Sequence, residues 1–304
     1  MAPFLISVPV FLIIAAGWLF KKYKIADEIW VHILNRFAYY ISLPAVIVSS
    51  FWSADFADKE YLKLVGWSSA FILAFMVLTV LVLSLMKLSY KTKAAIFLIV
   101  CTGNTVYMGF PIITNAFGSG ALAAGSLVAV LYLILPILAS IFVIRIWANG
   151  RRSFASQLAE FFKNPLTISA IAGVAVSFVP KQILGMDIIY KSVSLLGATA
   201  SPVALFALGA FLYKRFLKKD LALVFSSSLA KILGFPLLAY IAGNLISVPK
   251  NEFGLLVMMA AMPSAVTTFV IAEKFSLNEG AVGNALLVST ILSFFVIPFV
   301  AAIL

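Results

Sequence analysis

Charged residues are scarce in this chain of 304 residues, where they make up 11% of the sequence. A soluble globular domain carries about 25% charged residues, so the composition excludes an ordinary soluble domain. What the chain has instead is 63% hydrophobic residues and a mean hydropathy of +1.12. We therefore predict an all-α integral membrane protein, whose solvent is the lipid bilayer.

Cysteine and histidine are nearly absent, since Cys101 and His32 are the single residues of their kinds. One cysteine excludes an intrachain disulfide and a cysteine-based metal cluster. The apolar segments contain no paired carboxylates, and no glycine-rich phosphate loop precedes a lysine at the required spacing. These absences argue against an enzyme, a bound cofactor or metal, and a pump driven by ATP. Gradients are left as the energy source, with H⁺ or Na⁺ as open alternatives for a coupling ion.

Long apolar runs fill the rest of the chain. About 20 apolar residues are needed to cross the hydrocarbon core, and this measure predicts ten transmembrane helices. The first run follows no basic segment and precedes no small-residue cleavage site, which favours a retained helix over a signal peptide. The predicted helices cover residues 3–20, 29–52, 64–86, 94–117, 121–146, 165–184, 188–213, 221–247, 253–274 and 280–303.

The net charge of +11 is unevenly distributed. Fifteen lysines and arginines lie in the loops after the odd-numbered predicted helices, and five lie on the opposite side. The positive-inside rule places the first set in the cytoplasm, so both termini are expected outside a cell (inner) membrane that the chain crosses many times. The charge excess is thus a topology signal, and we set nucleic-acid binding aside.

Landmarks of the first half recur in the second half at a nearly constant offset. The pairs are Pro44 with Pro202 at 158, residues 65–69 with 224–228 at 159, residues 103–104 with 263–264 at 160, and Pro136 with Pro298 at 162. Five helices per half reverse the orientation of the second half, which predicts a 5+5 inverted repeat. The expected repeats are residues 1–147 and 165–304. Residues 148–164 form a cytoplasmic linker, either an amphipathic helix on the inner leaflet or a solvated segment.

Two of the predicted helices, the fourth and the ninth, contain residues near their middles that a transmembrane helix normally avoids. An unpaired backbone group inside a bilayer costs several kcal/mol, so such a break persists where it lines a polar cavity. A half-helix starting just after residue 104 would direct free amides and a positive dipole end at a carboxylate. The alternative is a proline-kinked helix whose asparagine bonds a neighbour. The residues concerned are Gly103, Asn104 and Thr105 in the first break, and Met262, Pro263, Ser264 and Thr267 in the second.

These motifs resemble those of the auxin efflux carrier family, which includes the plant PIN-type carriers and bacterial permeases. Residues 103–111, GNTVYMGFP, look like the N-T-x-x-M-G-x-P motif of the family. Residues 260–264, AAMPS, with 269–275 resemble the second crossover motif, and residues 206–209, FALG, are similar to F-S-L-G. Two departures are a glycine, Gly103, where plant carriers often have proline, and a third helix without the acid and lysine of the plant proteins.

The resemblance implies a fold like that of the bile acid/sodium symporters, with broken crossover helices 4 and 9. It implies a scaffold domain of helices 1, 2, 6 and 7 and a transport domain of helices 3–5 and 8–10. It also implies carboxylate substrates bound at the crossing, elevator-type movement and a homodimer formed through the scaffold. By motif position, Asn104 matches the substrate-binding asparagine of the family, and Pro263 matches the second crossover proline.

Two further residues lie in the expected membrane interior. Lys231 is about eleven residues into the eighth helix, with no acid within a turn or two. A charge at this depth costs about 2.5–3.5 kcal/mol on insertion scales, so it usually serves a function. In one interpretation, Lys231 neutralises a substrate carboxylate or mimics a coupling cation. In the other, it is a structural clamp that donates hydrogen bonds to carbonyls of a broken helix. Tyr132 in the fifth helix either lines the cavity or packs against its neighbours.

Together these features predict a secondary transporter of elevator type for a small organic anion, such as a mono- or dicarboxylate. A sodium-coupled organic anion symporter is the nearest alternative. A membrane receptor on the same fold, which would bind ligand without flux, is another, and an intramembrane enzyme is disfavoured by the lack of catalytic pairs.

Overall fold

The computed structural model describes residues 3–54, 59–147, 159, 162–179, 185–214, 220–246 and 248–304. Most of the predicted linker at 148–164 lies outside these residues. So do several basic residues of the topology argument, namely Arg151, Arg152, Lys181, Arg215, Lys218 and Lys219. The described chain is helical apart from its turns and one isolated β-bridge.

The helices follow one another along the apolar runs. The first half contains η1 (Pro3–Ile6), α1 (Val8–Lys22), α2 (Glu28–Phe37), η2 (Ala38–Ser42), α3 (Leu43–Ser53), α4 (Lys59–Leu85), α5 (Tyr90–Cys101), α6 (Gly109–Phe117), η3 (Ser119–Ala121) and α7 (Leu122–Trp147). The second half contains α9 (Pro165–Ser177), α10 (Met186–Ala198), α11 (Ala200–Leu212), α12 (Leu221–Leu229), η4 (Ala230–Gly234), α13 (Phe235–Leu245), α14 (Lys250–Ala260), α15 (Val266–Lys274) and α16 (Glu279–Ile303).

Six stretches of helix in the described chain are long and apolar enough to cross a membrane. They are Glu28–Ser53, Lys59–Leu85, Ala124–Ile144, Met186–Leu212, Leu221–Leu245 and Glu279–Ile303, and Pro165–Ser177 is a shorter apolar helix. The predicted spans at 94–117 and 253–274 each contain two short helices separated by an interruption. The chain is therefore a multi-pass helical membrane protein, and the number of ten crossings stays a prediction.

Two long helices contain a π-helical turn directly before a proline. In η2 and η4 the turn closes with bonds from Leu43 N to Ala38 O and from Phe235 N to Ala230 O, each spanning five residues. Pro44 and Pro236 follow at the next position. Proline lacks an amide hydrogen and its ring clashes with the carbonyl four residues earlier, so a wider turn relieves the crowding.

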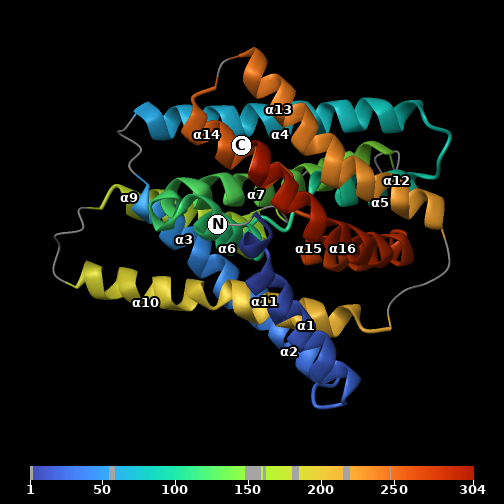
Figure 1. Cartoon of the computed structure of the whole chain (residues 1–304), viewed down its shortest axis with the longest axis horizontal. Coiled ribbons are helices and arrows are strands. Elements are labelled where there is room, and N and C mark those ends of the chain that lie inside the picture. Colours follow the sequence, from blue (N-terminus) through green and yellow to red (C-terminus); the bar gives the residue numbers. More distant parts are fainter. Residues whose placement is uncertain are drawn as a thin grey trace.

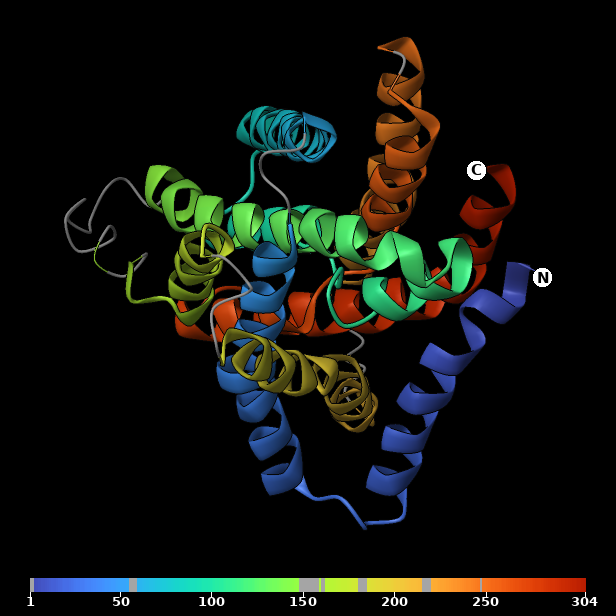
Figure 2. The same ribbon diagram turned by 90° about the vertical axis from the view of Figure 1, so that its left-hand side faces the viewer.

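The helices pack in two groups, which Figures 1 and 2 show from two directions. In the first, which we call the α1 group, α1 packs on α11, and α3 packs on α9 and α10. In the second, the α7 group, α4 and α5 pack on α7, α12 and α15 pack on α16, and α13 packs on α14. The α4 and α13 helices lie at the edge farthest from α1 and α2 (Figure 2). Contacts between α3 and α7 join the groups.

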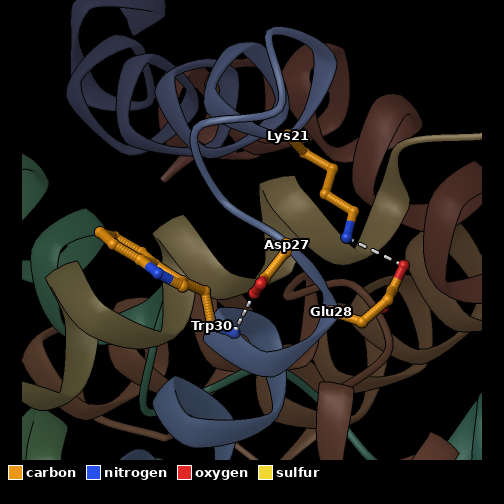
Figure 3. Close-up of polar contacts among 4 residues, drawn as sticks. All are labelled: Lys21, Asp27, Glu28 and Trp30. Carbon is orange, nitrogen blue, oxygen red and sulfur yellow. Dashed lines mark hydrogen bonds and ion pairs between the residues drawn. The ribbon is translucent and has the colours of Figure 1, made fainter.

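Polar side chains define the turn between α1 and α2 (Figure 3). The Asp27 carboxylate accepts a 2.9 Å hydrogen bond from the Trp30 amide and so caps the first turn of α2. Lys21, at the end of α1, forms a 2.9 Å ion pair with Glu28. The cap and the ion pair fix where α2 begins relative to α1.

Candidate functional site

The two interrupted helices meet at their interruptions. The first interrupted segment runs from α5, which ends at Cys101, to α6. The second runs from α14, which ends at Ala260, to α15. Gly103 and Ser264 form an antiparallel β-bridge. The backbone amide of Asn104 donates to Pro263 O at 2.7 Å, and the backbone amide of Ala265 donates to Thr102 O at 3.2 Å. Backbone groups that lost their helical partners thus pair with each other across the crossing.

Hydroxyl groups anchor this crossing to the surrounding helices. Thr105 Oγ1 donates to the Ala129 carbonyl of α7 at 2.6 Å. Ser264 Oγ donates to the Ile99 carbonyl of α5 at 2.9 Å. The Ser264 amide, in turn, donates to Ser289 Oγ of α16 at 3.2 Å. The hydroxyl hydrogens of Thr105 and Ser264 are therefore engaged within the protein, which suits them to holding the interruption in shape.

A small central cavity of about 10 Å³ lies on one face of the crossing. Its walls combine the interruption residues with apolar side chains of α3 and α7. The Asn104 Nδ2 and Thr267 Oγ1 atoms are buried, and neither has a hydrogen-bond partner within the described residues. The walls consist of Leu43, Gly103, Asn104, Thr105, Val106, Tyr107, Leu133, Ala265 and Thr267.

The electrostatics of this cavity favour negative charge. Ala265 caps α15 and Thr267 lies in its first turn, where backbone amides lack acceptors within the helix. The helix dipole adds a partial positive charge of about half an elementary charge at this end. The other half-helix, α6, begins at Gly109, later than predicted, and the Asn104 carbonyl already accepts the Met108 and Gly109 amides. The positive end at the cavity is therefore that of α15.

Two larger cavities flank the central one. The serine cavity has a volume of about 400 Å³, and its wall includes Ser49, Ser50, Ser53, Ser126 and Ser194. The lysine cavity has a volume of about 750 Å³, and its wall includes Tyr39, Tyr40, Ser140, Lys163, Thr267 and Lys274. Thr267 lies in the walls of both the central and the lysine cavity, so these two adjoin each other.

Two separate helices place the three cavities in the same order. Along the continuous helix Glu28–Ser53, Tyr39 borders the lysine cavity, Leu43 the central cavity and Ser53 the serine cavity. Along α7 the order reverses with chain direction, from Ser126 through Leu133 to Ser140. A rise of 1.5 Å per residue makes the distance between Ser126 and Ser140 about 21 Å. The cavities therefore form a row whose constriction is the crossing.

The remaining predicted site residues lie outside the central cavity. Lys231 is buried on the α12–α13 side, and a methyl group added at Gly103 would lie 3.1 Å from Lys231 Nζ. Its ammonium also lies 4.9 Å from the centre of the Phe235 ring. The Tyr132 ring packs 5.4 Å from the same Phe235 ring, and its buried hydroxyl has no partner within the described residues. Met262 packs near Gly109, where an added methyl group would lie 3.7 Å from Met262 Cγ.

Apolar residues of the cavity were missed by the sequence argument. Leu43 and Leu133 close the walls from α3 and α7, and Ala265 precedes α15. Leucines and alanines fill every helix of this chain, so no local signal distinguishes these three. The proline after Leu43 marks a helix perturbation, but the side on which the leucine projects depends on the π turn.

Comparisons with known proteins identify the family of this chain. A family model described as "Membrane transport protein" matches residues 5–152 and 151–301. An uncharacterised transporter of Methanocaldococcus jannaschii is 24% identical over 302 residues, covering 98% of this chain and 97% of its own. An uncharacterised transporter of Methanothermobacter thermautotrophicus is 25% identical over 308 residues, with 97% and 96% covered. The matches extend over nearly the whole chain and confirm the family that the motifs predicted: the protein belongs to the membrane transport protein family of auxin efflux carrier type.

Proposed function

We propose that this transporter carries a small organic anion, such as a mono- or dicarboxylate, bound where the two interrupted helices cross. The observation that carries the proposal is the pair of buried donors, Asn104 Nδ2 and Thr267 Oγ1, which lack partners within the described residues and line one cavity. A donor left unsatisfied in a protein interior costs about 1–3 kcal/mol, and a bound carboxylate would remove that cost. The first turn of α15 adds a favourable dipole for the same charge.

The proposed mechanism is alternating access of elevator type. Every wall residue of the central cavity except Leu43 belongs to the α7 group or its connecting segments, whereas Leu43 belongs to the α1 group. Displacing the α7 group along the Glu28–Ser53 helix would carry the site past Leu43, from the level of Tyr39 to the level of Ser53. The site would then open first to the lysine cavity and afterwards to the serine cavity. A volume of about 10 Å³ suits a closed state, so we expect the cavity to widen when substrate binds.

Several family features extend the proposal. The α1 group corresponds to the scaffold domain, the α7 group to the transport domain, and the two interruptions to the crossover helices of a 5+5 inverted repeat. The asymmetry of basic residues supports an orientation in the cell (inner) membrane with both termini outside. We also propose a homodimer assembled through the α1 group, as the family resemblance implies.

Uptake of labelled mono- and dicarboxylates into proteoliposomes tests the proposal. The informative variants are Asn104→Ala and Thr267→Val, each of which removes one donor from the central cavity. We expect uptake at low substrate concentration to fall about tenfold to a hundredfold, because a hydrogen bond to a charged group contributes about 1.5–3 kcal/mol.

Thr102→Val is the matched control. The Thr102 hydroxyl is also buried without a partner in the described chain, but it does not line the central cavity. We expect this variant to keep wild-type uptake. Equal losses in Thr102→Val and Thr267→Val would contradict the assignment of Thr267 to the substrate site.

A receptor on the same fold gives a different result in the same assay. It would be stabilised against heat by a carboxylate, since a ligand stabilises the state that it binds, but it would show no uptake above empty liposomes. Stabilisation with flux in the wild-type protein supports the transporter.

A further inference from the structure

We propose that Lys231 supplies a fixed internal cation beside the interruption that follows α5, so that anion binding at the crossing requires no sodium. This inference rests on the proposed transport of organic anions. It assigns to Lys231 an electrostatic role exerted across the crossing backbone, in place of direct contact with substrate.

The position of Lys231 is unusual for a lysine. It is 1% exposed, and no other charged side chain is buried among those whose burial the structure describes. Among those residues, no carboxylate pairs with its ammonium, and no carbonyl accepts a hydrogen bond from it. Its close neighbours are Gly103, beside the β-bridge, and the Phe235 ring at 4.9 Å. A cation–π contact of this kind offsets only part of the cost of burying a charge.

The crossing brings two negative helix ends to the same place. The amides that would continue α5 and α14 are bonded elsewhere: that of Asn104 to Pro263 O, that of Ser264 to Ser289 Oγ, and that of Ala265 to Thr102 O. Pro263 has no amide to offer. The carbonyls of Val100 and Ala260 therefore lack their helical donors, whereas Ile99 O accepts from Ser264 Oγ and Met259 O accepts from the Met262 amide. Each helix also adds about half a negative charge through its dipole. A positive charge beside Gly103, two residues past the end of α5, is attracted to the negative end of that helix.

The backbone of the crossing separates this charge from the substrate cavity. Gly103 lines the central cavity, and Lys231 does not, although an added methyl at Gly103 would lie 3.1 Å from Nζ. A carboxylate at Asn104 and Thr267 would thus lie near the ammonium without touching it. Attraction over this short distance inside the protein is screened far less than in water.

Unwound carbonyls and half-helix C-terminal ends are the groups with which membrane carriers coordinate sodium. Here a covalently attached ammonium lies beside Gly103, close to the end of α5. Its placement follows from the fold, because the π turn η4 is packed against α5 and α16 and carries Lys231 in its second position. A second cation at the same ends would be repelled by the first, which is why we expect no sodium requirement.

Uptake by the wild-type protein in sodium and in choline media tests this inference without any mutation. We expect initial rates that differ by less than about twofold, since no site is left for the ion to fill. Uptake that requires sodium overturns the inference and leaves the proposed anion transport standing. Absence of carboxylate uptake in every medium overturns both.

Lys231→Met tests the charge itself, because methionine keeps the buried volume and removes the ammonium. We expect the KM for the anion to rise at least about tenfold in protein that elutes as a single species, because carboxylate binding loses its attraction to the ammonium. The matched control is Lys191→Met, on an exposed turn of α10, which should leave the KM unchanged. An unchanged KM in Lys231→Met, with a lowered melting temperature, would identify Lys231 as a structural clamp and overturn the inference.

Discussion

Hydroxyl groups at the crossing fall into two kinds, distinguished by their partners. Thr105 and Ser264 donate to carbonyls of α7 and α5 and so stabilise the interruption. The buried hydroxyl of Thr267 has no partner in the described chain, and neither does the side-chain amide nitrogen of Asn104. An unsatisfied donor is a net cost to folding, and for these two donors, which line the central cavity, an acceptor that arrives from outside would remove that cost.

This distinction predicts opposite effects on stability for two identical substitutions. Thr105→Val removes the donor to Ala129 O and should destabilise the protein by about 0.5–1.5 kcal/mol, the net contribution of one intramolecular hydrogen bond. Thr267→Val removes a buried hydroxyl that has no partner to lose, so it should leave stability unchanged or slightly raised. Melting temperatures of the ligand-free variants in detergent measure the difference. A larger loss in Thr267→Val than in Thr105→Val would show that the Thr267 hydroxyl is engaged within the protein.

The residues that interrupt the helices could be predicted, and the face on which each side chain lies could not. Gly103, Asn104 and Pro263 stand out in an apolar run because each weakens a helix or needs a polar partner. Lys231 stands out for its charge. Spacing along the chain does not reveal that Lys231 lies beside Gly103 without lining the cavity that Gly103 borders, because this depends on how η4 packs against the crossing.

Two prolines within long helices mark π turns as well as helix kinks. Pro44 was noted as a repeat landmark, and Pro236 had no role in the sequence argument. In the structure each follows a π turn, and the second of these turns carries Lys231. An X-Pro pair inside a long apolar helix is therefore a usable signal of a wide turn, although it does not say which side chain that turn displaces.

Glycines set the closest approach between helices α1 and α11. A methyl group added at Gly17 would lie 2.0 Å from the Phe206 carbonyl oxygen, and one added at Gly209 would lie 1.9 Å from that of Ile14. Both contacts are with backbone, which cannot move aside as a flexible side chain can. Small residues permit this kind of close helix packing in membranes.

Gly17→Ala should accordingly force α1 and α11 apart and destabilise the protein by about 1–3 kcal/mol or more, the usual cost of overpacking. Gly66→Ala is the matched control, because a methyl group there meets no atom within 4 Å and alanine favours the helix by up to about 1 kcal/mol. Melting temperatures and yields of monodisperse protein provide the measurement. Equal stability of the two variants would mean that α1 and α11 do not approach as closely as described.

At the scale of the whole molecule, the cavities and the packing groups follow the same axis. The serine, central and lysine cavities succeed one another along the Glu28–Ser53 helix and along α7, which belong to different groups. Relative sliding of these two helices therefore changes which large cavity the central one meets. The basic side chains Lys163 and Lys274 border only the lysine cavity, so the positive-inside rule assigns that end to the cytoplasm.

This arrangement predicts how single cysteines react with a charged, membrane-impermeant thiol reagent. Ser53→Cys, in the serine cavity, should be labelled from outside the cell, and Val270→Cys, at a 44% exposed position of the lysine cavity, from the cytoplasmic side of inverted vesicles. Native Cys101 is fully buried and should give no background. Leu81→Cys, on the exposed face of α4, is the lipid-facing control and should stay unlabelled from either side, because a charged reagent does not enter hydrocarbon.

Bound substrate should further distinguish the two cavities from separate surface pockets. A saturating carboxylate shifts the population toward whichever state binds it more tightly, so labelling should fall at one cysteine and rise or hold at the other. Labelling of both cysteines from the same side would mean that the cavities do not lie on a path across the membrane. If substrate changes labelling at neither cysteine, the row of cavities is not the transport path, because movement of the α7 group must change the access to at least one cavity.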